Sequence, residues 1–349
     1  MVVLTKIDYK KFPCQGSPFQ SSFWGAIKHA SGWNAHAFSL EVEGWHSQVL
    51  VLVKKLFPLC SLAYIPFGPD VFNCPTLGIS EFIKELSREL RRQLPKSVFA
   101  IRYDLPWDEV NDPNVMKLEG KRFRTAKESV QPDGTVRLDL QWGYEAVTYG
   151  YRDRAKRALR KSSQVVDVSL WNGDTNDFKR WYNVYLETAR RDGFSARSSK
   201  YLKALLALDG KVAGDVKCKL ILAWREGIII GGCIILMGFS EAVYLFGASL
   251  RLDNITCSHV LQDFAISLAC ENGCKYYDFF GIPGPMGRGL HLKGLELFKL
   301  SFGGQPYYRT PTTDYVIRLV VWKIYSITEN IRYRLNRQAW NQEGYLPSS

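Results

Sequence analysis

One lysine lies in an unusually apolar part of the sequence. Lys299 stands between Phe298 and Leu300, after a segment rich in glycine and proline at residues 281–290. A lysine in such a setting must extend to solvent, pair with an anion or release its proton more readily. If it stays charged, it can stabilise negative charge that develops in a reaction. The preceding segment follows a buried strand pattern, which is a usual place for a ligand-binding loop.

A second candidate lies at the junction of two predicted helices. Gly193 is expected to end one helix, and Ser198 or Ser199 to cap the next. Arg197 then lies in the turn between them, and Tyr201 follows one turn later. A guanidinium beside the free amides of a helix N-terminus can clamp an anion. A surface arginine in a helix–helix turn is the alternative interpretation.

The densest basic run spans residues 152–161. If this run is helical, Arg154, Arg157 and Lys161 share one face. Such a face can neutralise phosphates without reading a nucleotide sequence. A merely solvated face explains the same pattern.

Composition and charge set the broad class of the protein. The chain has 349 residues, enough for about two domains, and its content of 46% hydrophobic and 23% charged residues is that of a globular protein. Lysine and arginine exceed aspartate and glutamate by 46 to 34, a formal charge of +12. Such an excess indicates an anionic partner, such as RNA, nucleotide phosphates or an acidic membrane surface, unless it serves solubility alone.

Several other classes of protein lack support in the sequence. The first residues do not resemble a signal peptide, and no apolar stretch approaches the ~20 residues of a spanning helix. We therefore expect a cytoplasmic protein, with peripheral contact to a membrane left open. The eight cysteines and five histidines show no metal-ligand spacing, so no metal site is predicted. P-loop, nucleophile-elbow and dinucleotide fingerprints are also missing from the sequence.

The hydrophobic pattern predicts the same order of elements in each half of the chain. In the first half, helix, three strands, helix and strand are expected at residues 21–29, 37–42, 48–53, 62–66, 80–94 (with Ser80 as N-cap) and 98–103. In the second half, two helices, three strands, helix and strand are expected at residues 178–191, 200–208, 219–224, 228–236, 242–246, 259–271 and 276–280.

This order is that of the GCN5-related acyltransferase (GNAT) fold, in which a mixed sheet splays between its central strands to hold the acyl donor. We therefore expect an α/β protein of two tandem GNAT-like domains, with mixed sheets flanked by helices. The first domain would comprise residues 1–147 and 317–349, and the second residues 148–316.

Three connecting segments complete the predicted organisation. Residues 117–129 are charged and weakly periodic, so a loop is expected there, and residues 151–163 would bridge the two halves. Residues 316–340 form a helical pattern that is long enough to pack back on the first domain. The alternative for this last segment is a free amphipathic tail that touches a membrane.

Five segments, spread in order over nearly the whole chain, resemble the FemABX peptidyltransferases, which build the cross-bridge of bacterial peptidoglycan. They are PFQSSFWGAIK at 18–28, YIPFGP at 64–69, YLETARRDGF at 185–194 with Arg197 and Tyr201, YLFGAS at 244–249, and YDFFGIP at 277–283 with Phe298, Lys299 and residues 302–304. Only a short stretch separates Tyr201 from the strand predicted at residue 219, so the coiled-coil arm of the FemA and FemB branches is not expected here, and the chain is closer to the compact FemX type.

The resemblance implies an aminoacyltransferase. It would move an amino acid from aminoacyl-tRNA, as co-substrate and without another cofactor, to the side-chain amine of the diamino acid in a peptidoglycan stem peptide. The acceptor would be the soluble UDP-MurNAc-pentapeptide or its lipid-linked form. A monomer is expected.

The resemblance also assigns roles to residues of the acceptor groove. Lys28 and Arg197 would hold the phosphates of the acceptor. Tyr201 and Tyr244 would line the groove together with Phe246, which lacks the hydroxyl of the tyrosine frequent at its position.

Further roles concern the transfer itself and the tRNA. Phe298 and Lys299 would lie at the transfer centre, near the terminal adenosine of the tRNA, with the Lys299 ammonium stabilising the oxyanion. Asp104 and Asp314 are candidates for substrate binding or for accepting the proton of the amine. The basic face of residues 152–161 would contact the tRNA.

Two other functions remain open. The first is an acyl-CoA-dependent N-acyltransferase of envelope polysaccharide synthesis, which would normally need a glycine-rich pyrophosphate loop where residues 247–256 hold one glycine. The second is a non-catalytic basic module that binds RNA or a membrane surface.

Overall fold

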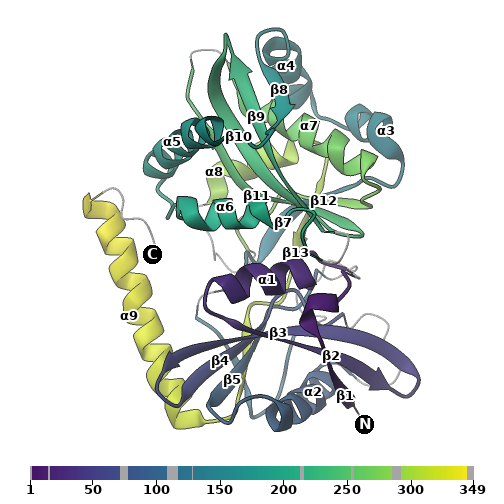
Figure 1. Cartoon of the computed structure of the whole chain (residues 1–349), viewed down its shortest axis with the longest axis vertical. Coiled ribbons are helices and arrows are strands. Elements are labelled where there is room, and N and C mark those ends of the chain that lie inside the picture. The colour runs from purple at the N-terminus through teal and green to yellow at the C-terminus, as the bar shows by residue number, and fades with distance from the viewer. Residues whose placement is uncertain are drawn as a thin grey trace.

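The computed structural model describes residues 2–14, 16–70, 78–107, 117–127, 129–212, 216–252, 255–284 and 292–343, with side chains described through residue 332. Two seven-stranded mixed sheets form the two halves of the molecule (Figure 1). This confirms the predicted tandem GNAT-like fold.

The first sheet has the strand order β1-β2-β3-β4-β5-β14-β6. Its strands are β1 (Val3–Ile7), β2 (Asn34–Val42), β3 (Trp45–Phe57), β4 (Cys60–Ile65), β5 (Val98–Tyr103), β14 (Thr313–Val316) and β6 (Phe123–Thr125). Helices α1 (Ser22–Ala30) and α2 (Ile79–Gln93) pack on its two faces, and a short 3-10 helix, Tyr9–Lys11, precedes α1.

The second sheet has the order β13-β7-β12-β11-β10-β9-β8. Its strands are β13 (Gln305–Tyr308), β7 (Gly134–Asp139), β12 (Tyr276–Asp278), β11 (Glu241–Ser249), β10 (Ile228–Met237), β9 (Lys217–Arg225) and β8 (Asp167–Leu170). The helices of this half are α3 (Gly143–Tyr149), α4 (Asp153–Ser162), α5 (Thr175–Asp192), α6 (Ser199–Ala207), α7 (Cys257–Glu271) and α8 (Lys293–Leu300).

A parallel strand pair lies at the centre of each sheet, but only the second sheet opens there. β4 pairs with β5 from Ser61 through Ile65. β11 pairs with β12 only at its first residues, through Val243, although β11 continues along β10 to Ser249. The outer part of β11 therefore has a free edge, and the splay that can receive an acyl donor belongs to the second half of the chain.

Apolar side chains connect the two halves in one core. One cluster joins α1 and the inner face of the first sheet to α5, α6 and one face of the second sheet. The opposite face of the second sheet packs against α3, α4 and α7. The opposite face of the first sheet packs against α2. The two sheets therefore share a buried interface.

The strands divide between the sheets differently from the expected boundaries. β7, from the segment expected in the first domain, pairs with β12 and β13 in the second sheet. β14, expected in the second domain, pairs with β5 and β6 in the first. Both strands are short, and the partners that define them are distant in sequence, so hydrophobic periodicity does not reveal their sheet.

Three local expectations are also corrected. The expected loop at 117–129 contains β6, which forms because β14 offers it a free edge. Gly78, not Ser80, is the N-cap of α2, and the Ser80 hydroxyl instead accepts from the backbone amide of Glu119 at 2.9 Å. α4 does not bridge the halves, since it packs on α7 of the second sheet.

The last helix, α9 (Leu319–Glu343), returns to the first half, as one of the two expectations stated. Val321, Trp322 and Tyr325 pack on an apolar cluster formed by β4 and β5. Among the described helices, none combines the length and apolar character needed to cross a membrane.

Gly232 of β10 offers a test of the packing between α5 and the second sheet. A Cβ atom at this position would lie 2.6 Å from the fully buried Trp181 ring and 2.7 Å from the carbonyl oxygen of Ile221. We expect Gly232→Ala to lower the free energy of unfolding by about 1–3 kcal/mol in urea titrations. Gly294→Ala, where a Cβ atom meets nothing within 4 Å, is the control and should not destabilise the protein. Equal stability of both variants would contradict this packing.

Candidate functional site

A groove of about 350 Å³ lies between the two halves. Its lining comes from α1 and strands β3 to β5 of the first half, from α6 and β11 of the second half, and from α9. Four of the predicted acceptor-binding residues line it together: Lys28, Arg197, Tyr201 and Phe246. The structure thus brings together residues from both halves of the chain.

The junction of α5 and α6 places Arg197 in this groove. Gly193 ends α5 in the left-handed conformation, with φ of 68°, and the Ser198 hydroxyl caps α6 by accepting from the amide of Tyr201 at 3.3 Å. The amide of Arg197 donates to the Tyr185 hydroxyl at 3.3 Å. The expected turn is confirmed, and the backbone of Arg197 is fixed while its guanidinium stays exposed at the groove.

Lys28, in the last turn of α1, brings a second positive charge to the groove beside that of Arg197. Its ammonium lies 4.7 Å from the centre of the Trp24 ring. Burial, followed by repulsion from Arg197 and Lys54, lowers the pKa of Lys28 to about 8. No carboxylate among the described residues opposes this shift. A bound anion would raise the pKa again, so this part of the groove is built for negative charge.

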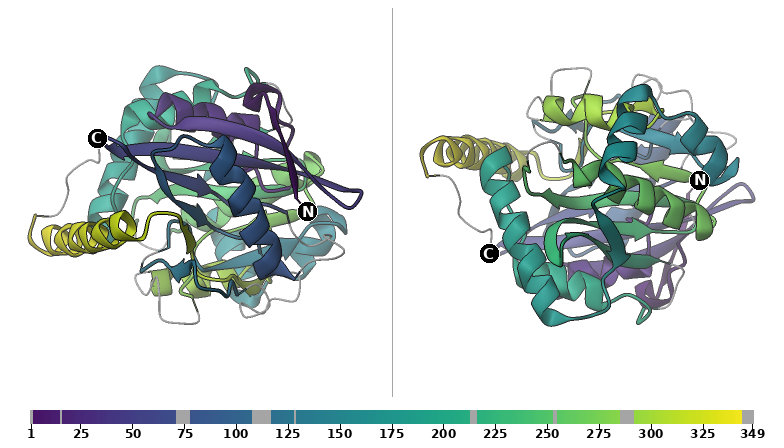
Figure 2. Two further views of the ribbon diagram at one scale, coloured as in Figure 1. Left: turned by 90° about the horizontal axis from the view of Figure 1, so that it is seen from below. Right: turned by 90° about the horizontal axis from the view of Figure 1, so that it is seen from above.

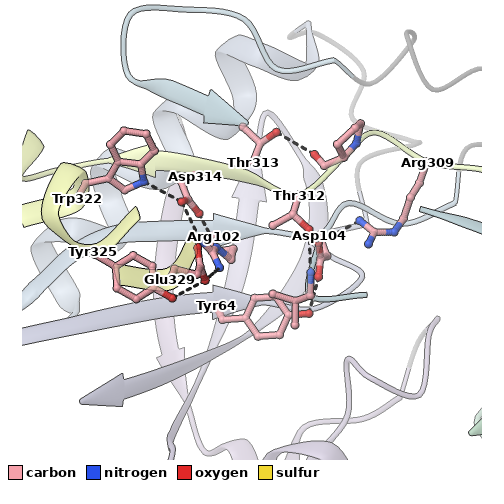
Figure 3. A network of polar contacts seen from close by, with 12 residues as sticks. Tyr64, Arg102, Asp104, Arg309, Thr312, Thr313, Asp314, Trp322, Tyr325 and Glu329 are labelled. Carbon is pink, nitrogen blue, oxygen red and sulfur yellow. Dashed lines mark hydrogen bonds and ion pairs between the residues drawn. The ribbon is translucent and has the colours of Figure 1, made fainter. Parts of the chain in front are cut away.

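A buried ion-pair network supports another wall of the groove (Figure 3). Arg102 Nε donates to Asp314 at 2.7 Å, and its Nη1 donates to Glu329 of α9 at 2.7 Å. Trp322 and Tyr325 of α9 donate to the same two carboxylates, at 2.8 and 2.6 Å. Arg102, Tyr325 and Glu329 all line the groove, so this network fixes the wall that α9 contributes.

Asp104 serves a similar supporting role under Tyr64. Its carboxylate is fully buried, pairs with Arg309 Nη1 at 3.0 Å, and accepts from the Tyr64 hydroxyl at 2.5 Å and from the Thr312 hydroxyl. Tyr64 lines the groove, whereas neither Asp104 nor Asp314 is among the lining residues. Both aspartates are therefore placed behind the groove, paired with arginines, rather than at the substrate as the sequence suggested.

A β-bulge decides which side chains of β11 face the groove. Ile234 pairs with Phe246 and Ile235 with Tyr244, which leaves Leu245 as an extra residue. Leu245 and Phe246 consequently both line the groove. Tyr244 packs instead into the cluster on the α7 face of the sheet, contrary to the expected lining. It directly follows Val243, the last residue of β11 paired with β12, and so lies at the splay.

Lys299 is a buried residue of α8. It does not line the groove itself, but it contacts a residue that does. Its ammonium donates to the carbonyl oxygens of Phe280 and, at 2.5 Å, Gly281. Burial lowers the pKa of Lys299 to about 7, and the nearby Asp278 opposes this effect in part. Phe280 lines the groove and has a φ of 52°, a conformation unusual for a residue with a side chain. Lys299 therefore holds the turn that sets the position of a groove residue.

Phe298 and the basic helix lie together on the α7 face of the second sheet. The Phe298 ring packs edge-on against His259, with ring centroids 4.9 Å apart. Burial, followed by the charge of Arg154, lowers the pKa of that histidine to about 4. Arg154, Arg157 and Lys161 are exposed on α4, whose buried Ala155 packs inward. Arg154 and Phe298 thus both lie near His259, on the side of the sheet that also holds Tyr244.

Comparison with known proteins agrees with this architecture. The family model "Acetyltransferase (GNAT) domain" matches residues 150–299. The Lipid II:glycine glycyltransferase of Staphylococcus aureus (strain bovine RF122 / ET3-1) is 21% identical, over 92% of each chain. A crystal structure of FemX superposes with a TM-score of 0.74 at 18% identity, over 93% of this chain and 100% of that one. The chain is thus similar to both of these proteins over nearly its whole length.

The fold is also similar to that of proteins with other roles. A tandem GNAT protein from the clavulanic acid biosynthesis pathway superposes with a TM-score of 0.50 at 12% identity, over 90% of this chain and 98% of that one. The paired GNAT architecture alone therefore does not specify the substrate. In this chain, nine residues (208–216) join α6 to β9, too few for a coiled-coil arm.

Sequence reasoning missed several residues that line the groove. Arg102 lies within the apolar strand VFAIRY, a signal of the same kind as that of Lys299. Glu329 and Tyr325 belong to a helix at the other end of the chain, and nothing local links them to the groove. Among the described residues, no group of three or more histidine, cysteine, aspartate and glutamate side chains could hold a metal ion.

The lowered pKa of Lys28 predicts a pH-dependent affinity for anions. Below about pH 8 the free ammonium is charged, and above it the charge is lost, so the Kd for uridine diphosphate should rise by up to about tenfold per pH unit beyond that point. Calorimetric titrations from about pH 7.5 to about pH 9 measure this, because phosphate ionisation is nearly complete and the uracil ring is still mostly neutral in that range.

Lys28→Arg is the matched control, since an arginine stays charged throughout. Its Kd should be independent of pH over the same range. A flat profile for the wild-type protein, or an equal slope for both proteins, would show that Lys28 does not bind the anion.

Proposed function

We propose that this protein transfers an amino acid from aminoacyl-tRNA to the side-chain amine of the diamino acid in a peptidoglycan-precursor stem peptide. The observation that carries the proposal is the groove with Lys28 and Arg197 on one side of a sheet whose splayed edge can receive an acyl donor. The named activity of the staphylococcal relative, a lipid II:glycine glycyltransferase, supports transfer to a lipid-linked precursor. Both substrates favour the cytoplasm, and the proposed active unit is a monomer.

The acceptor would occupy the groove through its diphosphate and its apolar parts. Lys28 and Arg197 supply two positive charges for the diphosphate. The Trp24, Tyr201 and Phe246 rings offer aromatic surface for sugar or peptide groups. The soluble UDP-linked and the lipid-linked precursors share this diphosphate, so the same contacts serve both.

The donor would approach from the α7 face of the second sheet. The basic face of α4, with Arg154, Arg157 and Lys161, is suited to tRNA phosphates near Phe298. The splay after Val243 would hold the aminoacyl ester, with Tyr244 at its edge. In this arrangement donor and acceptor meet across β11, near the turn that contains Phe280.

The transfer needs no external base. The neutral amine attacks the ester carbonyl and forms the C–N bond, and the C–O bond to the ribose then breaks. The departing ribose oxygen takes up the proton that the amine loses, so atoms and charges balance. This route suits the structure, because Asp104 and Asp314 are engaged with arginines. Placement of the two substrates can then remove roughly 7–11 kcal/mol of the barrier.

Product analysis tests the reaction class. The protein is incubated with aminoacyl-tRNA or acetyl-CoA, together with UDP-MurNAc-pentapeptide or its lipid-linked form, and the acceptor is examined by mass spectrometry. We expect the mass of one aminoacyl residue to be added from tRNA and nothing from acetyl-CoA. Acetylation of the acceptor would favour the acyl-CoA-dependent alternative, and no product from either donor would favour a non-catalytic module.

Kinetics of two variants separate binding from turnover. Arg197→Ala should raise the KM for the acceptor about tenfold or more and leave kcat nearly unchanged, because a phosphate contact is made before and during the reaction. Lys299→Met should lower kcat by about 10- to 100-fold with little change in KM, because it releases the turn at Phe280 and Gly281.

Exposed residues of the same elements provide the controls. Arg190→Ala on α5 and Lys293→Met on α8 should leave both kinetic constants within about twofold of the wild type. If Arg197→Ala and Lys299→Met behave like these controls, the assignment of the groove is wrong.

A further inference from the structure

One face of α9 is apolar and uncovered. Four β-branched side chains recur along it at helical spacing, and a leucine precedes them. They are Leu319 (46% exposed), Val320 (71%), Ile324 (60%), Ile327 (58%) and Ile331 (51%). Spacings of four, three and four residues place Val320, Ile324, Ile327 and Ile331 on a single stripe, and Leu319 lies beside its N-terminal end.

The stripe is distinct from the face that packs on the protein. Val321, Trp322 and Tyr325 contact the first sheet, and Glu329 binds Arg102. α9 lies at the edge of the molecule in all three views and extends away from the body toward its C-terminal end (Figures 1 and 2). The buried ion pair holds the helix in this orientation, so the exposed stripe is presented in a fixed direction.

We infer that the exposed stripe of α9, Leu319, Val320, Ile324, Ile327 and Ile331, docks on the surface of an anionic lipid bilayer. This inference rests on the proposed function, because it would bring the groove to a lipid-linked acceptor. A helix with one apolar face and polar flanks can lie in the bilayer interface without crossing it.

The position of the groove favours lipid as the occupant. Tyr325, Glu329 and Arg332 line the groove from the same helix that carries the stripe. A helix is ~10 Å across, so a bilayer that touches the stripe lies about one helix diameter from the groove. The diphosphate of a lipid-linked precursor lies at the bilayer surface, and docking through α9 would bring that surface to the end of the groove that α9 lines.

Charge points to the same partner. The chain carries a formal charge of +12, and Lys323 and Arg332 are exposed on α9, with the exposed Arg318 directly before it. Basic side chains beside an apolar face are attracted to anionic headgroups. Two copies of this chain would repel each other. The stripe also offers on the order of a few hundred Å² of apolar surface, less than the roughly 800 Å² per partner of a stable dimer.

Vesicle sedimentation tests the inference without any transferase substrate. We expect the wild-type protein to sediment with vesicles of phosphatidylcholine and phosphatidylglycerol, and less so at high salt. Ile324→Ser together with Ile327→Ser should lower the bound fraction about fivefold or more. The control is Ile228→Ser with Phe239→Ser. Both residues are exposed and apolar; Ile228 is the first residue of β10, and Phe239 lies in the turn between β10 and β11. This control should bind like the wild type.

Activity distinguishes this inference from the proposed function. The α9 variant should keep wild-type kinetics with the soluble UDP-linked acceptor and lose activity only with the lipid-linked acceptor in vesicles. Absence of vesicle binding by the wild-type protein, or equal binding by the α9 variant, would overturn the inference and leave the transferase proposal intact. A concentration-dependent dimer in sedimentation velocity that the α9 variant abolishes would also overturn it.

A second measurement covers the case of a poorly folded variant. Ile327→Cys, labelled with an environment-sensitive fluorophore, should show a blue shift on anionic vesicles relative to wild-type protein treated with the same reagent. Ile228→Cys, labelled in the same way, should show none. An equal response at the two positions would rule out docking through α9.

Discussion

Two buried arginine–aspartate pairs fasten the C-terminal part of the chain to the first half. Arg102 binds Asp314 and Arg309 binds Asp104, across separations of 212 and 205 residues. These pairs lie where the chain returns from the second sheet to supply β14 and then α9 (Figure 3). Removing one member of such a pair leaves an unpaired buried charge, which costs about 3–5 kcal/mol. The groove depends on both pairs, since they hold Arg102 and Tyr64 in its lining.

The two GNAT-like halves contribute different parts of the site. The first sheet keeps its central parallel pair closed, and it contributes Lys28, Tyr64 and Arg102 to the groove. The second sheet opens after Val243 and carries the basic helix on its outer face. In the described part of the chain, the central parallel pair is splayed in the second sheet and closed in the first, and β11 lies between that splay and the groove.

The resemblance to a known family made several parts of the site predictable. It assigned Lys28, Arg197, Tyr201, Tyr244 and Phe246 to one groove, and the structure brings all of them except Tyr244 together there. Gly193 and Ser198 fixed the turn at Arg197, because a left-handed glycine and a serine cap are local devices. The aspartates could not be assigned in this way, since a carboxylate in an apolar pattern is equally consistent with a substrate contact and with a buried ion pair.

The sequence by itself determined the order of helices and strands in each half, the repeat of that order and the local turns. These features depend on periodicity and on short-range caps, which are properties of neighbouring residues. Only the tertiary structure decided that β7 and β14 exchange sheets, that the β11 bulge turns Tyr244 away from the groove, and that Lys299 supports a turn. Strand partners, bulges and the surroundings of a buried charge depend on residues far apart in the chain, and no local pattern records them.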